Sequence, residues 1–69
     1  MNLLNAEAKK EYIIKDIETH DEEMRGFLFS LGCYSGEKIT VVDKKRNLVV
    51  SIKDARYNID KELADAICI

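Results

Sequence analysis

The stretch Leu28–Val42, LFSLGCYSGEKITVV, changes its apolar spacing across two glycines. Up to Gly32 the apolar residues recur at the i, i+3, i+4 and i+7 spacing of one helix face, and these are Met24, Phe27, Leu28 and Leu31. After Gly36, Ile39 and Val41 alternate with polar residues, which is the spacing of a strand. The sequence therefore predicts a helix that ends at Gly32 in the left-handed conformation, a tight turn at Gly36, and then a strand.

The segment before this helix supplies its start signal and a first strand. Residues 11–17, EYIIKDI, are rich in β-branched side chains and predict a strand with Tyr12, Ile14 and Ile17 toward a core. Thr19 and Glu22 then have the spacing of a capping box, which predicts that the helix begins after Thr19.

The rest of the chain predicts short strands joined by hairpins. Strands are expected over residues 37–43, 48–53 and 56–60, a polar connection over 44–47, a two-residue turn at 54–55, one helical turn over 61–66 and a closing strand over 67–69. Hairpin connections exclude a parallel βαβ domain. We therefore expect a mainly β fold with one short α-helix, closed as a small antiparallel barrel over residues 10–69, and a tail or short turn over residues 1–9.

Length and composition limit the functions to consider. A chain of 69 residues holds one domain, and 46% hydrophobic residues without proline or tryptophan is typical of a folded chain. Eleven Lys and Arg against thirteen Asp and Glu give a net charge of -2, which argues against nucleic acid as a partner. The only dense basic spot is Lys44–Arg46, which is more typical of a solvated hairpin tip than of a phosphate site. No apolar stretch is long enough for a signal peptide or a membrane span, so we expect a cytoplasmic protein.

Catalysis is not indicated by the residues, whereas metal binding stays open. The single histidine has no adjacent nucleophile and no Gly-rich phosphate loop is present, so we do not expect an enzyme. Four side chains that can ligate a metal lie around the predicted helix start, and two cysteines lie elsewhere in the chain. They are His20, Asp21, Glu22, Glu23, Cys33 and Cys68. For the acidic residues the alternative role is to cap the helix and to interact with its dipole.

Phe29 is the clearest candidate for a partner contact. On a helical wheel it points away from the apolar stripe, and its neighbours there are Arg25 and Gly26. An exposed aromatic side chain beside an arginine has the composition of an interaction hot spot. The alternative is that Leu3 and Leu4 fold back over Phe29 and make it part of the core.

Several of these residues together resemble the FeoA family, the ferrous iron transport protein A type. The resemblance lies in Leu31-Gly32-x-x-x-Gly36 followed by Ile39-x-Val41, and in the final Leu63-Ala64-x-x-Ile67-x-Ile69. Three places depart from the family pattern, since Gly26 follows Arg25 where an arginine-leucine pair is common, Ser35 stands where a proline is common, and Asp54 stands where a turn glycine is common. The resemblance implies an SH3-like barrel, the fold that also forms the C-terminal domain of iron-dependent repressors of the diphtheria toxin repressor type.

The resemblance also implies a function and a partner. It implies a non-enzymatic cytoplasmic accessory protein that docks on the membrane ferrous iron permease, which carries a GTP-binding domain. The residues expected at this contact are Arg25, Phe29, Cys33, Tyr34, Ser35 and Gly36. The alternative is a stand-alone SH3-like regulatory domain of the repressor type that binds a peptide segment or a metal.

Weak binding of Fe(II) or another divalent transition metal is a further expectation. Asp16 and Thr19 match positions that resemble a metal-contacting acid and amide in the repressor domain, although a threonine replaces the amide. Together with the candidates at the helix start, the expected ligands are Asp16, His20 and Glu23.

Overall fold

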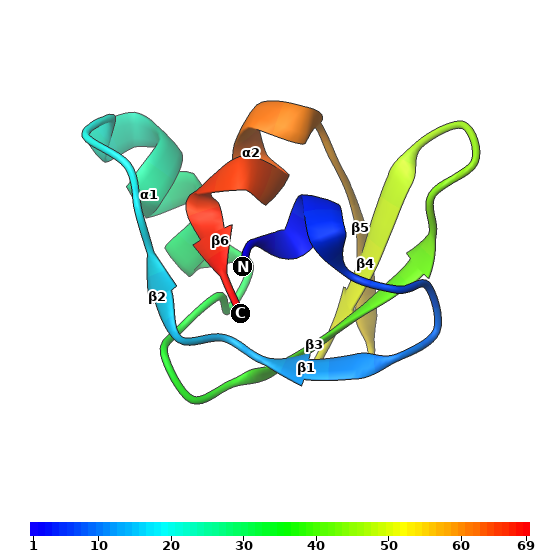
Figure 1. Cartoon of the computed structure of the whole chain (residues 1–69). Coiled ribbons are helices and arrows are strands. Elements are labelled where there is room, and N and C mark those ends of the chain that lie inside the picture. The colour runs from blue at the N-terminus through cyan, green and yellow to red at the C-terminus, as the bar shows by residue number, and fades with distance from the viewer.

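Two antiparallel sheets and three short helical segments make up the computed structural model, which describes residues 1–69 (Figure 1). One sheet has the strand order β1-β3-β4-β5 and the other pairs β2 with β6. The strands are β1 (Glu11–Ile13), β2 (Asp16–Ile17), β3 (Lys38–Asp43), β4 (Leu48–Ile52), β5 (Ala55–Ile59) and β6 (Ile67–Cys68). The helical segments are η1 (Leu3–Asn5), α1 (Glu22–Ser30) and α2 (Lys61–Ala66). The predicted mainly β, antiparallel architecture is confirmed.

Helix α1 ends as the two-glycine stretch predicts. Gly32 has a φ of 96°, and its N–H donates to the carbonyl of Phe29 at 3.0 Å. The N–H of Cys33 donates to the carbonyl of Leu28 at 3.1 Å, which completes a Schellman motif. Gly36 has a φ of 92° and closes the turn into β3.

The start of α1 differs from the capping box in the prediction. Asp21 is the N-cap, and its carboxylate accepts hydrogen bonds from the N–H groups of Glu23 and Met24. The hydroxyl of Thr19 instead accepts from the N–H of Asp21 at 3.1 Å. Thr19 thus shapes the turn before the helix, whereas Asp21 lies directly before the first helical residue, where its carboxylate reaches the free amides of the first turn.

The predicted strand over residues 11–17 is divided into β1 and β2, which pair in different sheets. β1 pairs with β3, whereas β2 pairs with β6 at the end of the chain. Between them the backbone of Ile14 bonds to Glu37 and Gly36, outside either ladder. This break lets one segment turn the corner between the two sheets while Ile14 and Ile17 both stay in the core.

The hairpin between β4 and β5 turns one residue earlier than predicted. Ile52 pairs with Ala55, so the two turn residues are Lys53 and Asp54, with φ of 50° and 67°. Two successive positive φ values are typical of a type I′ turn, which glycine favours and Asp tolerates. Asp54 therefore adopts a left-handed conformation that glycine occupies more readily.

Fifteen buried hydrophobic residues form one core inside the two sheets. They are Leu3, Ala6, Ile14, Ile17, Leu28, Cys33, Ile39, Val41, Val50, Ile52, Ile59, Ala64, Ala66, Ile67 and Ile69. The first residues of the chain contribute to it through η1, and the N–H of Ile69 donates to the carbonyl of Met1 at 3.0 Å. Figure 1 shows the two ends of the chain side by side at the centre of the fold.

Helix α1 buries a narrower face than its apolar stripe predicts. Leu28 is fully buried, and Met24 and Leu31 pack against the core at partial exposure. Phe27, expected in the core, is 47% exposed because it lies at the edge of the stripe on a helix of nine residues. Only the middle of the stripe meets the sheets.

Candidate functional site

An exposed aromatic pair stands where α1 meets the turn that follows it. The rings of Phe29 and Tyr34 stack with their centroids 5.5 Å apart and an interplanar angle of 24°. Phe29 is 36% exposed and Tyr34 48% exposed, so the pair presents apolar ring surface to solvent. The exposure of Phe29 agrees with the helical wheel, whereas Leu3 packs in the core.

The turn that carries Tyr34 is fixed by hydrogen bonds to the segment between β1 and β2. The N–H of Gly36 donates to the carbonyl of Ile14 at 2.7 Å, and the hydroxyl of Ser35 donates to the carbonyl of Lys15 at 2.8 Å. The N–H of Glu37 donates to the carbonyl of Tyr34 at 3.0 Å. These bonds leave the backbone of the turn little freedom, so the aromatic pair is preorganised for contact.

Arg25 links the first turns of α1 to the backbone that precedes the helix. Its guanidinium donates to the carbonyls of Ile17 at 3.1 Å and Thr19 at 2.7 Å, so it ties α1 to the end of β2. Its side chain is only partly exposed. Arg25 thus positions the helix that presents Phe29, and at most the edge of its guanidinium is free for a partner.

The two cysteines have different surroundings. Cys33 has no exposed surface, and burial raises the pKa of its thiol to about 11. Because Cys33 has no exposed surface, it lies in the core behind the turn and contributes to the turn by packing. Desolvation and the neighbouring Glu18 carboxylate raise the pKa of the partly exposed Cys68 thiol.

The expected metal ligands do not gather at one point. No three His, Cys, Asp or Glu side chains lie close enough to hold an ion. Asp16 and His20 line one shallow hollow together with Arg25, and Glu23 is outside it. One oxygen of Asp16 already accepts the N–H of Ile17 at 2.8 Å. Because the cationic guanidinium of Arg25 lines the same hollow and fewer than three ligand side chains meet, these residues do not fit a dedicated metal centre.

A second surface, which the sequence did not predict, lies on the other side of α1. Phe27 and Leu4 line an open cleft of about 790 Å³ together with the hairpin tip that joins β3 to β4. The basic run Lys44–Arg46 indicated the charged part of this surface. The sequence did not indicate its apolar part, because Phe27 was expected in the core.

Two antiparallel sheets around one core, with an exposed aromatic pair at the turn after α1, define a small SH3-like module. The FeoA domain model matches residues 1–69, and the chain belongs to the FeoA family. The predicted family is thereby confirmed, and the solved structures described next confirm the SH3-like fold.

Solved structures of three proteins illustrate the likeness. The zinc-complexed FeoA of Stenotrophomonas maltophilia, a prokaryotic SH3 domain protein, is 18% identical with a TM-score of 0.88, over 99% of this chain and 87% of that chain. Iron(II) transport protein A from Clostridium thermocellum is 25% identical with a TM-score of 0.88, over 99% of this chain and 43% of that chain. A manganese-dependent transcriptional repressor is 18% identical with a TM-score of 0.87, over 97% of this chain and 39% of that chain.

Two further findings concern curated proteins and membranes. No curated protein matches the sequence. No helix has the length and apolar character needed to cross a bilayer. Family membership and the SH3-like neighbours support an accessory role in ferrous iron transport.

Proposed function

We propose that this protein is a non-enzymatic accessory module of ferrous iron transport that docks on the cytoplasmic face of the membrane ferrous iron permease. The docking surface consists of Phe29, Tyr34, Ser35 and Gly36, with Arg25 and Cys33 holding it in place from behind. The protein works in the cytoplasm, at the inner face of the membrane through its partner.

The observation that carries this proposal is the stacked pair of Phe29 and Tyr34. Aromatic side chains supply much of the binding energy at protein interfaces because they bury a large area at a low cost in side-chain entropy. Here both rings are exposed, they stack on each other at 5.5 Å, and the turn below them is tied to Ile14 and Lys15. Gly36 adds exposed backbone that a partner can approach closely.

The proposal is tested by calorimetry with the GTP-binding cytoplasmic domain of the permease. Phe29→Ser and Tyr34→Ser should each weaken binding at least about tenfold, as removal of a hot-spot aromatic does. Phe27→Ser is the matched control, since it removes another exposed phenylalanine of the same helix and should leave the affinity unchanged. If Phe29→Ser lowers the melting temperature strongly, the ring supports the core; if it binds like the wild type, the docking surface is elsewhere.

A regulatory SH3-like domain that responds to metal is the second candidate function. It is favoured by the zinc held by the Stenotrophomonas maltophilia protein and by the fold shared with a manganese-dependent repressor. The residues of this chain weigh against it, because Asp16, His20 and Glu23 form no ligand cluster.

Metal dependence separates the two candidates. Docking on the permease domain should persist in a metal-free buffer containing a chelator if the first function holds. A requirement for Fe(II) would favour the regulatory domain. Titration of the labelled protein with Co(II) should give no saturable shift of the His20 and Asp16 resonances below millimolar metal.

A further inference from the structure

The cleft beside Phe27 combines an apolar floor with a basic rim. Its apolar residues come from five different elements, and they are Leu4, Phe27, Leu48, Ile59 and Leu63. Phe27 is 47% exposed and Leu4 36% exposed, so the floor is open to solvent. A cleft of about 790 Å³ has the size of pockets that enclose a ligand or several side chains.

The rim holds a large share of the positive charge of the protein. Four of the eleven Lys and Arg line the cleft, but only one of the thirteen Asp and Glu does. The four cations are Lys44, Lys45, Arg46 and Lys61. The single acid, Asp60, is the N-cap of α2 and accepts the N–H of Leu63 at 2.9 Å. The field over this cleft is therefore positive, although the protein as a whole is acidic.

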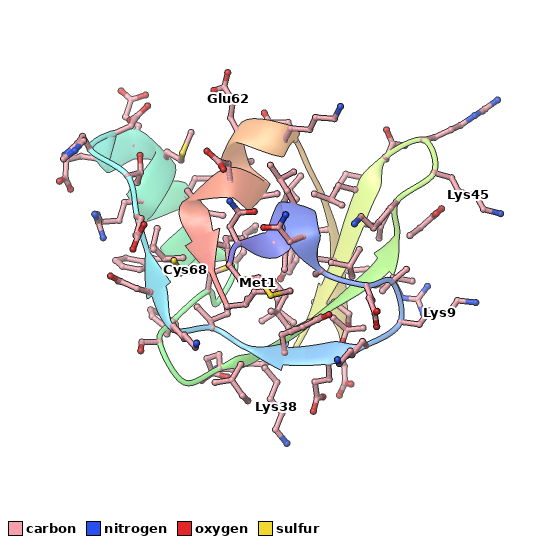
Figure 2. The ribbon with its side chains drawn as sticks, viewed as in Figure 1. Met1, Lys9, Lys38, Lys45, Glu62 and Cys68 are labelled. Atoms are coloured by element: carbon pink, nitrogen blue, oxygen red, sulfur yellow. The ribbon has the colours of Figure 1, made fainter.

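None of these cations has a carboxylate partner within the protein. The two ion pairs of the chain join Lys38 to Glu11 and Lys53 to Glu37, away from the cleft. Lys44 donates from Nζ to the carbonyls of Leu4 at 3.2 Å and Ala6 at 2.7 Å, which fixes the hairpin against the N-terminal segment but leaves its charge uncompensated. Figure 2 shows Lys45 extending from the hairpin tip into solvent.

We propose that this cleft binds an acidic segment of a partner protein, with one leucine- or phenylalanine-sized side chain on the floor beside Phe27 and carboxylates facing the rim. The charge of the rim selects acidic partners, and the exposed Phe27 supplies apolar contact. A side chain of a partner protein can enter the cleft and contact its apolar floor. The flat surface of a bilayer could contact only the hairpin tip at the rim. The proposal involves neither Phe29 nor Tyr34 and does not rest on docking to the permease.

The test uses the full chain, labelled with ¹⁵N, and defined probes. The first probe is a 12-residue peptide of Glu and Asp around a central Leu-Phe pair, and the second replaces every Glu and Asp by Gln and Asn. We expect saturable shifts of Leu4, Phe27 and Lys61 resonances with the acidic peptide, and binding at least about tenfold weaker with the neutral one. Binding should also weaken as salt is raised from 50 to 500 mM, because the rim charges are exposed and screened.

Matched variants locate the site. Arg46→Glu should weaken binding about fivefold, whereas Arg56→Glu, the same change on β5 outside the cleft, should not. Phe27→Ser should weaken it about tenfold or more, and Phe29→Ser should leave it unchanged. If Phe29→Ser did not weaken binding to the permease domain, the docking proposal would fail, but the peptide-binding result would be unaffected. The two proposals can therefore fail separately.

Three outcomes would overturn the proposal. The first is equal binding of the acidic and neutral peptides, or shifts that map away from the cleft. The second is binding to vesicles of phosphatidylglycerol through Lys45 and Arg46 without any response to the peptide, which would make the tip a lipid contact. The third is concentration-dependent dimerisation that Phe27→Ser abolishes, which would make a second copy of the chain the occupant.

Discussion

Cys33 lies in the core directly after the glycine that ends α1, and it has no exposed surface. Burial raises the pKa of its thiol from 9.0 to about 11, so the folded protein keeps it protonated where the unfolded chain ionises. Below pH 9 the thiol is protonated in both states, so its ionisation does not change stability there. Between the two pKa values ionisation favours only the unfolded chain.

Stability should therefore fall as pH rises from 9 toward 11. We expect a loss of about 1–2 kcal/mol in the free energy of unfolding from this one group, since a pKa unit corresponds to about 1.4 kcal/mol. Urea denaturation at intervals of half a pH unit measures it. Cys33→Ala is less stable throughout but lacks this decline; parallel curves for both proteins would show that the thiol is not responsible.

The two phenylalanines of α1 show what sequence can predict at this scale. The wheel correctly places Phe29 outside the stripe, because its direction differs widely from that of Leu28. It places Phe27 wrongly, because the width of a buried face depends on how the helix meets the sheets and not on the spacing alone. The stacking of Phe29 on Tyr34 joins residues from two elements and had no sequence signal.

At the scale of elements, two glycines have opposite roles in α1, since Gly26 lies within the helix and Gly32 lies just past its C-cap. Gly26 lies in the exposed helix interior, and a Cβ there would meet nothing within 4 Å. Gly32 has a φ of 96°, and its Cβ would lie 3.4 Å from Cγ2 of Ile52. The same substitution should therefore have opposite effects at the two positions.

Gly26→Ala should raise the free energy of unfolding by about 0.5–1 kcal/mol, because alanine loses less backbone entropy in a helix. Gly32→Ala should lower it by about 1–2 kcal/mol, because an L residue is strained in the left-handed conformation. Thermal and urea denaturation of both variants measure the difference. A stabilised Gly32→Ala would mean that the Schellman end of α1 can relax without cost.

The start of α1 gives a second prediction for this element. Asp21→Ala should cost about 1 kcal/mol, because Asp21 caps two amides of the first turn. Thr19→Ala should cost less than half as much, because its hydroxyl bonds only to the N–H of Asp21. If Thr19→Ala lowered the free energy of unfolding more than Asp21→Ala, Thr19 would be the N-cap, as the capping box in the sequence predicts.

At the scale of the whole molecule, the first residues are part of the core. Leu3 is fully buried, and the segment that carries it, η1, packs against α2. Its neighbour Leu4 is 36% exposed. Leu3→Ala should cost about 2–4 kcal/mol and Leu4→Ala less than about 1 kcal/mol. Chemical denaturation of the two variants tests this. Equal, small effects would mean that the barrel folds without its N-terminal segment.

Local signals predicted most elements, and long-range contacts account for what they missed. The strands after Gly36, the polar hairpin and the closing strand follow from spacing and turn residues. The division of residues 11–17 depends on β6, which lies at the other end of the chain, so no local pattern could reveal it. The basic cleft likewise needs Leu4 and Lys61 to meet the hairpin.

The meeting of Met1 with Ile69 has a kinetic consequence. The β2–β6 sheet forms only after a loop of most of the chain has closed, and the bond between Ile69 and Met1 spans the whole sequence, which is costly in entropy. Such a topology folds more slowly than one built from neighbouring hairpins. Joining the two ends by a short glycine linker would turn the most distant contact into a local one, and the cyclic chain should refold faster than the linear one.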